Sequence, residues 1–322
     1  MKYLIIQLCD SAPSFCHYDN GNSDELISLD VLRESIIWAM KRNTSVQVVY
    51  PKFEIPNEYK ELLNSIAHAG IVGSDCCDNQ ILHNAKIVII KDVKTEQDRI
   101  KPDVSYVLRL DSESLLRSND KLIPYFQNAQ RVNIIITDIQ LIKEPFFVEY
   151  KKWLERISEV IKREYLRGHL IQCNLLTDRF MLDKMNNCDA GHDSVTIAPN
   201  GKFYVCPAFY FDKMNHDPAA ECTLLGDIHK GIKIKNSQLY DLDYAPLCRI
   251  CDAFQCKRCV WLNKRMTYEV NTPSHQQCVL AHLERNASRL LLRQIQENTT
   301  FLPEKKIKEI DYLDPFDIKP IL

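Results

Sequence analysis

The sequence predicts an α/β protein in which a buried sheet is followed by a cysteine-rich final third. Short β-rich runs alternate with amphipathic helical stretches through about the first 175 residues. Some of these runs are continuously apolar, such as Ile134-Ile135-Ile136, which is typical of a parallel sheet covered on both faces. Eight of the 13 cysteines fall between Cys188 and Cys278. Alternation alone leaves two folds open, a partial (β/α) barrel and a doubly wound open sheet.

Individual elements follow from the same periodicity. Strands are expected at 3–8, 46–50, 86–90, 106–110, 131–136 and 169–173. A helix after Asp30 presents Leu32, Ile36 and Met40 on one face. A second helix starts at Pro56-Asn57 and is stopped by Gly70. Further helices are expected near 112–127 and 147–166.

The final third predicts a hairpin and a long helix. Residues 195–197 and 202–205 pair about the turn Asn200-Gly201. Ser274 caps a helix that runs to about Glu297. Its apolar positions are Leu280, Leu283, Leu290, Leu291 and Ile295. Its early turns carry His282, Glu284, Arg285 and Asn286. Two interpretations of these polar residues stay open: hydrogen bonding around a metal centre, or an ordinary solvated face.

Composition limits the possible functions. A chain of 322 residues holds about two domains, and its net charge of −2 argues against a strongly basic nucleic-acid surface. The first residues lead directly into a strand, no secretory signal is expected, and no apolar run reaches membrane-spanning length. The cysteines therefore indicate reduced thiols and metal ligands in a cytoplasmic protein, with no nucleic-acid or membrane partner. The sequence contains no GxGxxG, P-loop, HExxH or GxSxG motif.

The spacing of the cysteines favours soft-metal coordination. The order is Cys188-x12-Gly201-x4-Cys206, a gap that contains Cys222, then Cys248-x2-Cys251-x4-Cys256-x2-Cys259, a second gap, and Cys278. Paired zinc-binding cysteines usually stand about 15–20 residues apart, whereas four residues separate these two CxxC units. A single zinc on the central four cysteines is an alternative that leaves Cys188, Cys206 and Cys278 unexplained. Disulfides are a further alternative.

This cysteine pattern resembles the SPASM domain of radical-SAM peptide and protein maturases. The stretches 197–207 and 225–228 are similar to that domain's hairpin and later turn. The resemblance implies two auxiliary [4Fe–4S] clusters, the first held by Cys188, Cys206 and Cys259, the second by Cys248, Cys251, Cys256 and Cys278. The last two intervals of the central block are each one residue shorter than in the family. The first cluster lacks an obvious fourth ligand, for which the candidates are Cys173, His192 and Cys222.

The resemblance also implies a radical-SAM-like partial (β/α)6 barrel before the SPASM-like domain. Radical-SAM enzymes hold their catalytic cluster with C-x3-C-x2-C after the first strand. Here Cys9 and Cys16 are in register, but Pro13 occupies the middle position and offers no ligand. The resemblance therefore implies a degenerate motif without S-adenosylmethionine. Two alternatives are unrelated thiols in a loop, or an unusual cluster that recruits His17 or Cys76-Cys77.

Together these observations predict a degenerate barrel at 1–175, a SPASM-like domain with its C-terminal helix at 176–298, and a tail at 299–322. The stretch 253–286 is similar to the CXXX-repeat peptide maturases. The function implied is maturation of a ribosomally made, cysteine-rich precursor peptide, through peptide binding and auxiliary clusters without intrinsic radical chemistry. The alternative is a non-catalytic scaffold, or an electron-transfer partner of an authentic radical-SAM enzyme.

Overall fold

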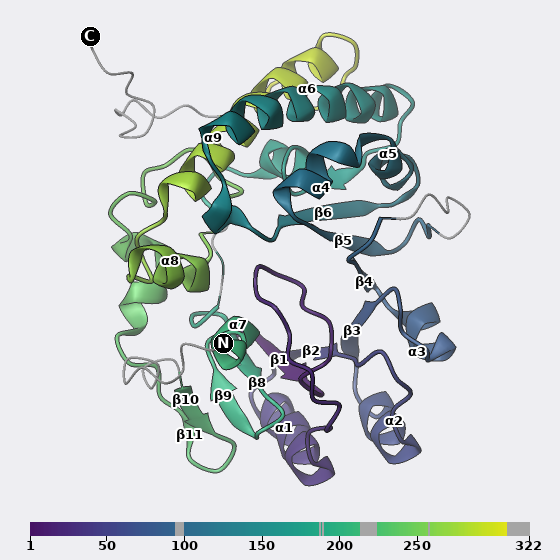
Figure 1. The fold of residues 1–322 in the computed structure, drawn as a ribbon, viewed down its shortest axis with the longest axis vertical. Helices are drawn as coiled ribbons and strands as arrows, with labels where there is room; N and C mark the ends of the chain where they lie inside the picture. Colours follow the sequence, from purple (N-terminus) through teal and green to yellow (C-terminus); the bar gives the residue numbers. More distant parts are fainter. Residues whose placement is uncertain (94–99, 187, 189, 213–223, 257, 308–322) are drawn as a thin grey trace. The chain divides into compact units, whose positions relative to one another are not determined.

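The computed structural model describes residues 1–93, 100–186, 188, 190–212, 224–256 and 258–307 (Figure 1). The chain forms two compact units, each built from two separate stretches of sequence. The first combines Met1–Ile90 with Asp189–Asp241, and the second combines Lys91–Cys188 with Leu242–Leu322. The predicted domain boundaries, which follow residues 175 and 298, stay a prediction.

The first unit is built on a mixed sheet. Its strands in the described residues are β1 (Tyr3–Gln7), β2 (Ser45–Val49), β3 (His68–Gly73), β4 (Ile87–Ile90), β8 (Ser194–Ile197), β9 (Lys202–Tyr204), β10 (Leu224–Asp227) and β11 (Gly231–Ile232). They lie side by side in the order β11-β10-β9-β8-β1-β2-β3-β4. The five strands from β8 to β4 are parallel, and β8 to β11 form antiparallel pairs.

The predicted hairpin is confirmed as the β8–β9 pair, with Thr196 opposite Tyr204 and Ile197 opposite Phe203. Gly201 adopts a φ of +73° in the turn, a conformation that glycine reaches without steric penalty. The helices of this unit are α1 (Leu29–Lys41), α2 (Asn57–Asn64), α3 (Asn79–Asn84) and α7 (Pro207–Phe211), with the 3-10 turn η5 (Ser237–Tyr240).

Helix α1 packs on the hairpin side of this sheet. Ser28 caps it by accepting the backbone N–H of Val31. The ring centroids of Trp38 and Phe203 lie 5.1 Å apart, which joins the helix to β9. Leu32 and Ile36 are buried as predicted, but Met40 is 67% exposed, so its assignment to the buried face was wrong. The buried face of α1 instead includes Trp38 and Ala39.

Strand β3 corrects a second expectation. Helix α2 ends at Asn64, and Gly70 lies inside β3 rather than at a helix terminus. A β-carbon at Gly70 would sit 3.4 Å from the Tyr50 ring, so the glycine lets that ring cover the strand. The sequence His68-Ala69-Gly70 lacks the β-branched and aromatic residues that mark a strand, and this is why the pattern hid it.

The N-terminus of α3 depends on one buried carboxylate. Asp78 accepts the backbone N–H groups of Gln80 and Ile81, both at 3.1 Å, and pairs with Lys60 at 2.7 Å. Burial opposes the charged form. The Lys60 ammonium and the backbone donors outweigh burial and hold the pKa of Asp78 below its ordinary value.

Replacing Asp78 by Ala is expected to destabilise the protein by about 1–2 kcal/mol, because the cap and the ion pair are both lost. Asp78→Asn keeps a capping acceptor and should lose less. Because the folded pKa is lowered, the stabilisation by the charge is present above the unfolded pKa of about 4 and is lost as pH falls through the folded value. Urea titrations from pH 7 to 3 should show the Asn variant and the parent converging. A constant gap would contradict this role.

The second unit contains a small parallel sheet covered by long helices. Its strands are β5 (Ser105–Leu110), β6 (Arg131–Ile136) and β7 (Gln172–Cys173), all parallel, in the order β5-β6-β7. Its helices are α4 (Ser112–Arg117), α5 (Asn119–Asn128), α6 (Glu144–Leu166), α8 (Val260–Thr267) and α9 (His275–Gln296), with 3-10 turns η2 (Ile139–Leu141), η3 (Thr177–Met181) and η6 (Leu242–Tyr244). Helices α6 and α9 lie side by side (Figure 1).

Helix α9 confirms the predicted cap, since Ser274 accepts the Gln277 backbone N–H. Leu280, Leu291 and Ile295 are buried, but Leu290 is 54% exposed and does not belong to the apolar face. His282 and Glu284 are buried, so they do not lie on a solvated face. Among the described residues, none of the helices combines the length and the apolarity needed to cross a membrane.

Both units have the α/β character that was predicted. Parallel strands follow one another in chain order, β1 to β4 in one unit and β5 to β7 in the other. A doubly wound sheet would reverse its strand order at a switch point. The sequential order is that of strands wound in one direction, as in a barrel.

Candidate metal centre

The cysteines predicted for the second cluster all belong to the second unit. Cys248, Cys251 and Cys256 lie on an irregular loop between η6 and α8, and Cys278 lies in the first turn of α9. The loop is built from consecutive tight turns. The backbone N–H of Cys248 donates to Ala245, that of Cys251 to Cys248, and that of Cys256 to Ala253, over 2.9–3.2 Å. Such turns direct several side chains toward one region without a regular element.

Three of these thiols influence one another: Cys248 is buried, and Cys251 and Cys256 are half-buried. Burial is the main cause that raises the pKa of Cys248 to about 12; the neighbouring thiols of Cys256 and Cys251 contribute to this rise, and the Arg258 guanidinium opposes it. Burial likewise raises the pKa of Cys256 to about 11, opposed by a hydrogen bond from the Arg258 backbone. Cys251 Sγ accepts the backbone N–H of Ala253 at 3.4 Å.

Helix α9 brings the fourth cysteine to the same region. His282 Nε2 lies 3.6 Å from Cys251 Sγ. Cys278 precedes His282 by four residues, one helical turn, and so lies on the same side of α9. Among these four described residues, no three sulfurs lie within 4.8 Å of one another. That the four cysteines hold a cluster stays a prediction.

Buried positive charge accompanies the thiols. Arg258 and Arg179 are both fully buried. Arg179 Nη2 donates to Glu284 Oε2 at 2.9 Å, and Tyr150 Oη donates to Glu284 Oε1 at 2.8 Å. Burial raises the pKa of Glu284, and the Arg179 guanidinium opposes that rise. Metal binding deprotonates thiols and would bring several negative charges into this site, which the Arg258 guanidinium would partly neutralise, since Arg179 is already paired with Glu284.

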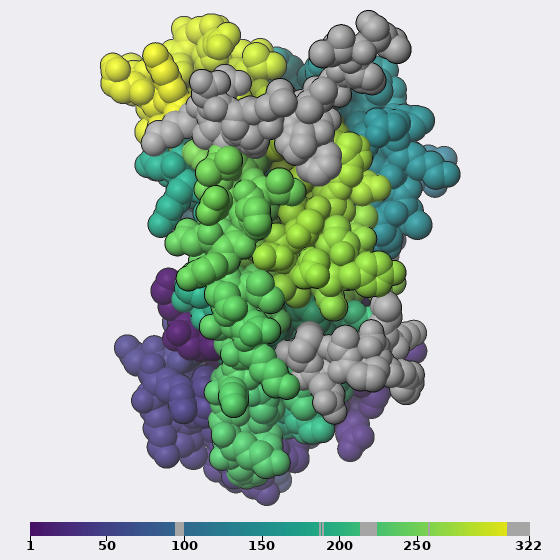
Figure 2. All heavy atoms as spheres, turned by 90° about the vertical axis from the view of Figure 1, so that its left-hand side faces the viewer, coloured from purple at the N-terminus to yellow at the C-terminus, as the bar shows by residue number. Residues whose placement is uncertain are grey.

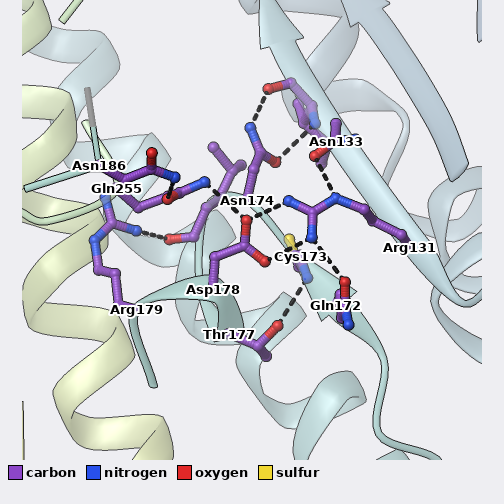
Figure 3. Close-up of polar contacts among 12 residues, drawn as sticks. Arg131, Asn133, Gln172, Cys173, Asn174, Thr177, Asp178, Arg179, Asn186 and Gln255 are labelled. Atoms are coloured by element: carbon purple, nitrogen blue, oxygen red, sulfur yellow. Dashed lines mark hydrogen bonds and ion pairs between the residues drawn. The ribbon is translucent and has the colours of Figure 1, made fainter. Parts of the chain in front are cut away.

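A hydrogen-bond network anchors the cysteine loop to the sheet (Figure 3). Gln255, which immediately precedes Cys256, donates from Nε2 to Asp178 Oδ2 at 2.8 Å and accepts from Asn186 Nδ2 at 2.8 Å. Arg131 at the start of β6 donates from Nη1 to Asp178 Oδ1 at 3.1 Å. Asn186 stands two residues before Cys188. The Gln255 side chain thus links the segments that contain Cys256 and Cys188 to Asp178, and Arg131 joins Asp178 to β6.

A second anchor joins the same loop to α9. Asp252, which is 1% exposed, pairs with Arg285 at 2.8 Å and also with Arg289. Figure 2 shows the green stretch that contains this loop at the molecular surface, beside the yellow-green helical residues that follow it. Charged and amide groups therefore position the loop from both sides, in addition to its buried Ala253 and Phe254 side chains.

Replacing Gln255 by Ala is expected to destabilise the protein by about 1–3 kcal/mol and to reduce metal retention, because Asp178 and Asn186 each lose a buried partner. Thermal melting and metal content after gel filtration measure the two effects. Gln172→Ala is the matched control, since Gln172 is an exposed amide that bonds to Arg131 at 2.8 Å without touching the loop. Equal effects of the two changes would contradict the role of Gln255.

The three cysteines predicted for the first cluster do not all belong to the same unit. Cys188 and Cys259 belong to the second unit and Cys206 to the first, so their joint role stays a prediction. Each is half-buried; Cys206 precedes α7 and Cys259 precedes α8.

Three residues are candidates for the fourth ligand of the first predicted cluster. Cys173 is fully buried in β7, and burial raises its pKa to about 12. His192 is exposed, with Nδ1 3.4 Å from Asp193. Cys222 lies outside the described residues.

The residues predicted to form a degenerate radical-SAM motif lie in the first unit, shortly after β1. Cys9 is fully buried, with Sγ 3.3 Å from Ser11 Oγ, and burial raises the pKa of its thiol. Cys16 is half-buried. Pro13, also buried, stands between them.

Sequence reasoning missed most of the groups around the thiols. Arg179, Tyr150, Gln255 and Arg258 carried no signal in the one-dimensional pattern, because each acquires its role from packing. His282 and Glu284 were expected either to hydrogen-bond around a metal centre or to lie on a solvated face. Their burial contradicts the second interpretation, and the first stays a prediction.

Comparison with known proteins gives the fold. No protein-family model and no curated protein matches the chain. Among solved structures, the chain is similar to a hexahistidine-tagged anaerobic sulfatase-maturating enzyme, a radical-SAM/SPASM protein, with bound AdoMet. The TM-score is 0.61 at 13% sequence identity, over 92% of this chain and 99% of the other. The chain therefore shares its overall α/β fold with that enzyme.

Proposed function

We propose that the chain is a radical-SAM/SPASM-type maturase of a ribosomally made, cysteine-rich peptide that works through two auxiliary [4Fe–4S] clusters. The fold supports a maturase, since the similar structure is a sulfatase-maturating enzyme. The observation that carries the proposal is the loop of Cys248, Cys251 and Cys256, with Cys278 beside it on α9. Its buried guanidinium groups and its anchors to β6 and α9 are what a multi-thiolate site requires.

The donor set fits an iron–sulfur cluster. Four cysteine sulfurs are the usual ligands of [4Fe–4S] clusters, and backbone N–H groups next to the sulfurs tune such sites. Ala253 and Arg258 supply donors of that kind to Cys251 and Cys256. When bound, a cluster here would supply one-electron transfer or thiolate ligation. The residues of this chain would hold the ligands in place and partly balance their charge.

We further propose that the chain performs no radical chemistry of its own. The similar structure contains AdoMet, but the middle ligand of the C-x3-C-x2-C motif is Pro13 here. Proline has neither a thiolate nor an imidazole, so three-ligand attachment of a catalytic cluster is lost. The barrel mouth would then receive the precursor peptide or an authentic radical-SAM partner enzyme.

Incubation of the anaerobic protein with S-adenosylmethionine and a strong reductant tests this part of the proposal. We expect no reductive cleavage of S-adenosylmethionine by the parent protein, even with a full complement of iron. Turnover above the rate of the buffer control would overturn the absence of radical chemistry and would leave the maturase fold untouched.

Peptide capture tests the first cluster. A cluster held by only three cysteines has an open iron, at which a thiolate of the peptide can bind. Replacing Cys188 by Ala is expected to abolish capture of a cysteine-containing precursor peptide. Cys77→Ala, at an exposed cysteine outside both sets, is the control. Undiminished capture by the Cys188 variant would contradict a substrate thiolate at this cluster.

A further inference from the structure

A hollow on the first unit has no role in the cluster chemistry. It has a volume of about 460 Å³ and is lined by the C-terminal half of α1 and by the turn that joins β10 to β11. All its lining residues belong to one unit, so its shape is set within that unit. It contains none of the cysteines.

The rim of this hollow is positively charged. Lys41, Arg42 and Lys230 contribute three cations, against one carboxylate from Glu34. Lys230 is 86% exposed and only loosely paired with Asp227 at 3.6 Å. Within the residues that the structure describes, neither Lys41 nor Arg42 has a carboxylate partner. This local excess of positive charge contrasts with a net charge of −2 for the whole chain.

The floor of the hollow is apolar and rigid. Ile37 is 43% exposed, and Trp38 is held from below by Phe203 at 5.1 Å. The Arg42 guanidinium lies over the indole ring, 4.3 Å from its centroid, which fixes the charge at the edge of the apolar surface. Cations in the last turn of α1 also balance the helix carbonyls. That effect accounts for Lys41 and Arg42, but not for Lys230 on the opposite wall.

We infer that this hollow binds an acidic peptide segment in which carboxylates alternate with aliphatic side chains. A carboxylate would lie between Lys41 and Arg42, and an aliphatic side chain would cover Ile37 and the edge of Trp38. Single-stranded nucleic acid fits less well, because base stacking needs an open aromatic face. Trp38 is only 8% exposed beneath Arg42. Assigning the segment to the precursor peptide rests on the proposed function.

The probe for this inference is a fluorescein-labelled peptide of three Leu-Glu-Ser repeats, with three Leu-Gln-Ser repeats as the uncharged control. Fluorescence anisotropy on the full chain should show binding of the acidic peptide that weakens with salt. Lys41→Gln/Arg42→Gln should weaken it by about fivefold or more, since two ion pairs are lost. Arg33→Gln is the matched control, an exposed cation on α1 that pairs with Asp30 at 3.0 Å, outside the hollow.

Four results would overturn the inference: no binding of the acidic peptide, equal binding of the uncharged one, an unchanged affinity in the double variant, or displacement by an oligothymidine at least as effective as by unlabelled peptide. Circular dichroism verifies that the double variant is folded. Iron content is measured on the same samples, because the hollow contains no cluster ligand. If the acidic peptide does not bind to protein that holds its full iron, only this inference is refuted. If the peptide binds to protein that holds no iron, only the cluster proposal is refuted.

Discussion

Replacing Cys248 and Cys251 together by Ser is expected to halve the iron content, from about eight to about four irons per chain, because one of two four-iron clusters loses two ligands. The remaining thiols of Cys256 and Cys278 do not suffice to hold a four-iron cluster. Sulfide content should fall in the same proportion. Iron and sulfide assays on anaerobically purified protein measure both quantities.

The matched control is Cys76→Ser/Cys77→Ser, which also removes two thiols. These residues lie in the first unit and in neither predicted ligand set; Cys76 is buried and Cys77 exposed. This control should keep all its iron. Full iron in the Cys248/Cys251 variant, or equal losses in both variants, would refute the assignment of the second cluster.

Replacing Arg179 by Met is expected to destabilise the protein by about 3–5 kcal/mol, because Glu284 would stay buried without its cation. Glu284 is 8% exposed, and among the described residues its side chain would keep the Tyr150 hydroxyl as its one hydrogen-bond partner. Removing both charges, in Arg179→Met/Glu284→Leu, should recover a large part of the loss. Urea unfolding of the metal-free chains measures these differences directly.

The stability of this double variant shows whether Arg179 acts through its ion pair with Glu284 or only by filling space. If Arg179 acted mainly by filling space, the second substitution would add to the first. A double variant that is less stable than Arg179→Met would contradict the proposed pairing. Lys162→Met, which breaks an exposed pair with Glu159 at 2.6 Å, should change stability by less than about 1 kcal/mol.

The sequence could predict those parts of the fold that are encoded locally. Apolar runs located β1, β2, β4, β5 and β6 to within one or two residues, since a buried parallel strand needs little else. It missed β3, whose two glycines imitate a turn. It overestimated β7, where only Gln172 and Cys173 pair with β6. A strand's length depends on its neighbour, which no local pattern contains.

In the candidate site, too, some residues could be predicted from the sequence and others could not. The spacing of Cys248, Cys251 and Cys256 is a local property and was visible in the sequence. The buried groups around them are not, because Arg179 and Tyr150 meet Glu284 from 105 and 134 positions away. Gln255 likewise bonds to Asp178 across 77 positions. Such partners become visible only when α6, α9 and η3 are packed together.

The most direct test of the central claim is the iron and sulfide content of anaerobically purified protein, with absorption spectra and the low-temperature EPR spectrum of the reduced form. We expect about eight irons per chain, a broad absorption near roughly 400 nm and no iron left for a third cluster. One or two zinc ions in a colourless protein would contradict it. The chain would then carry a structural zinc module, and the proposals that depend on cluster chemistry would fall.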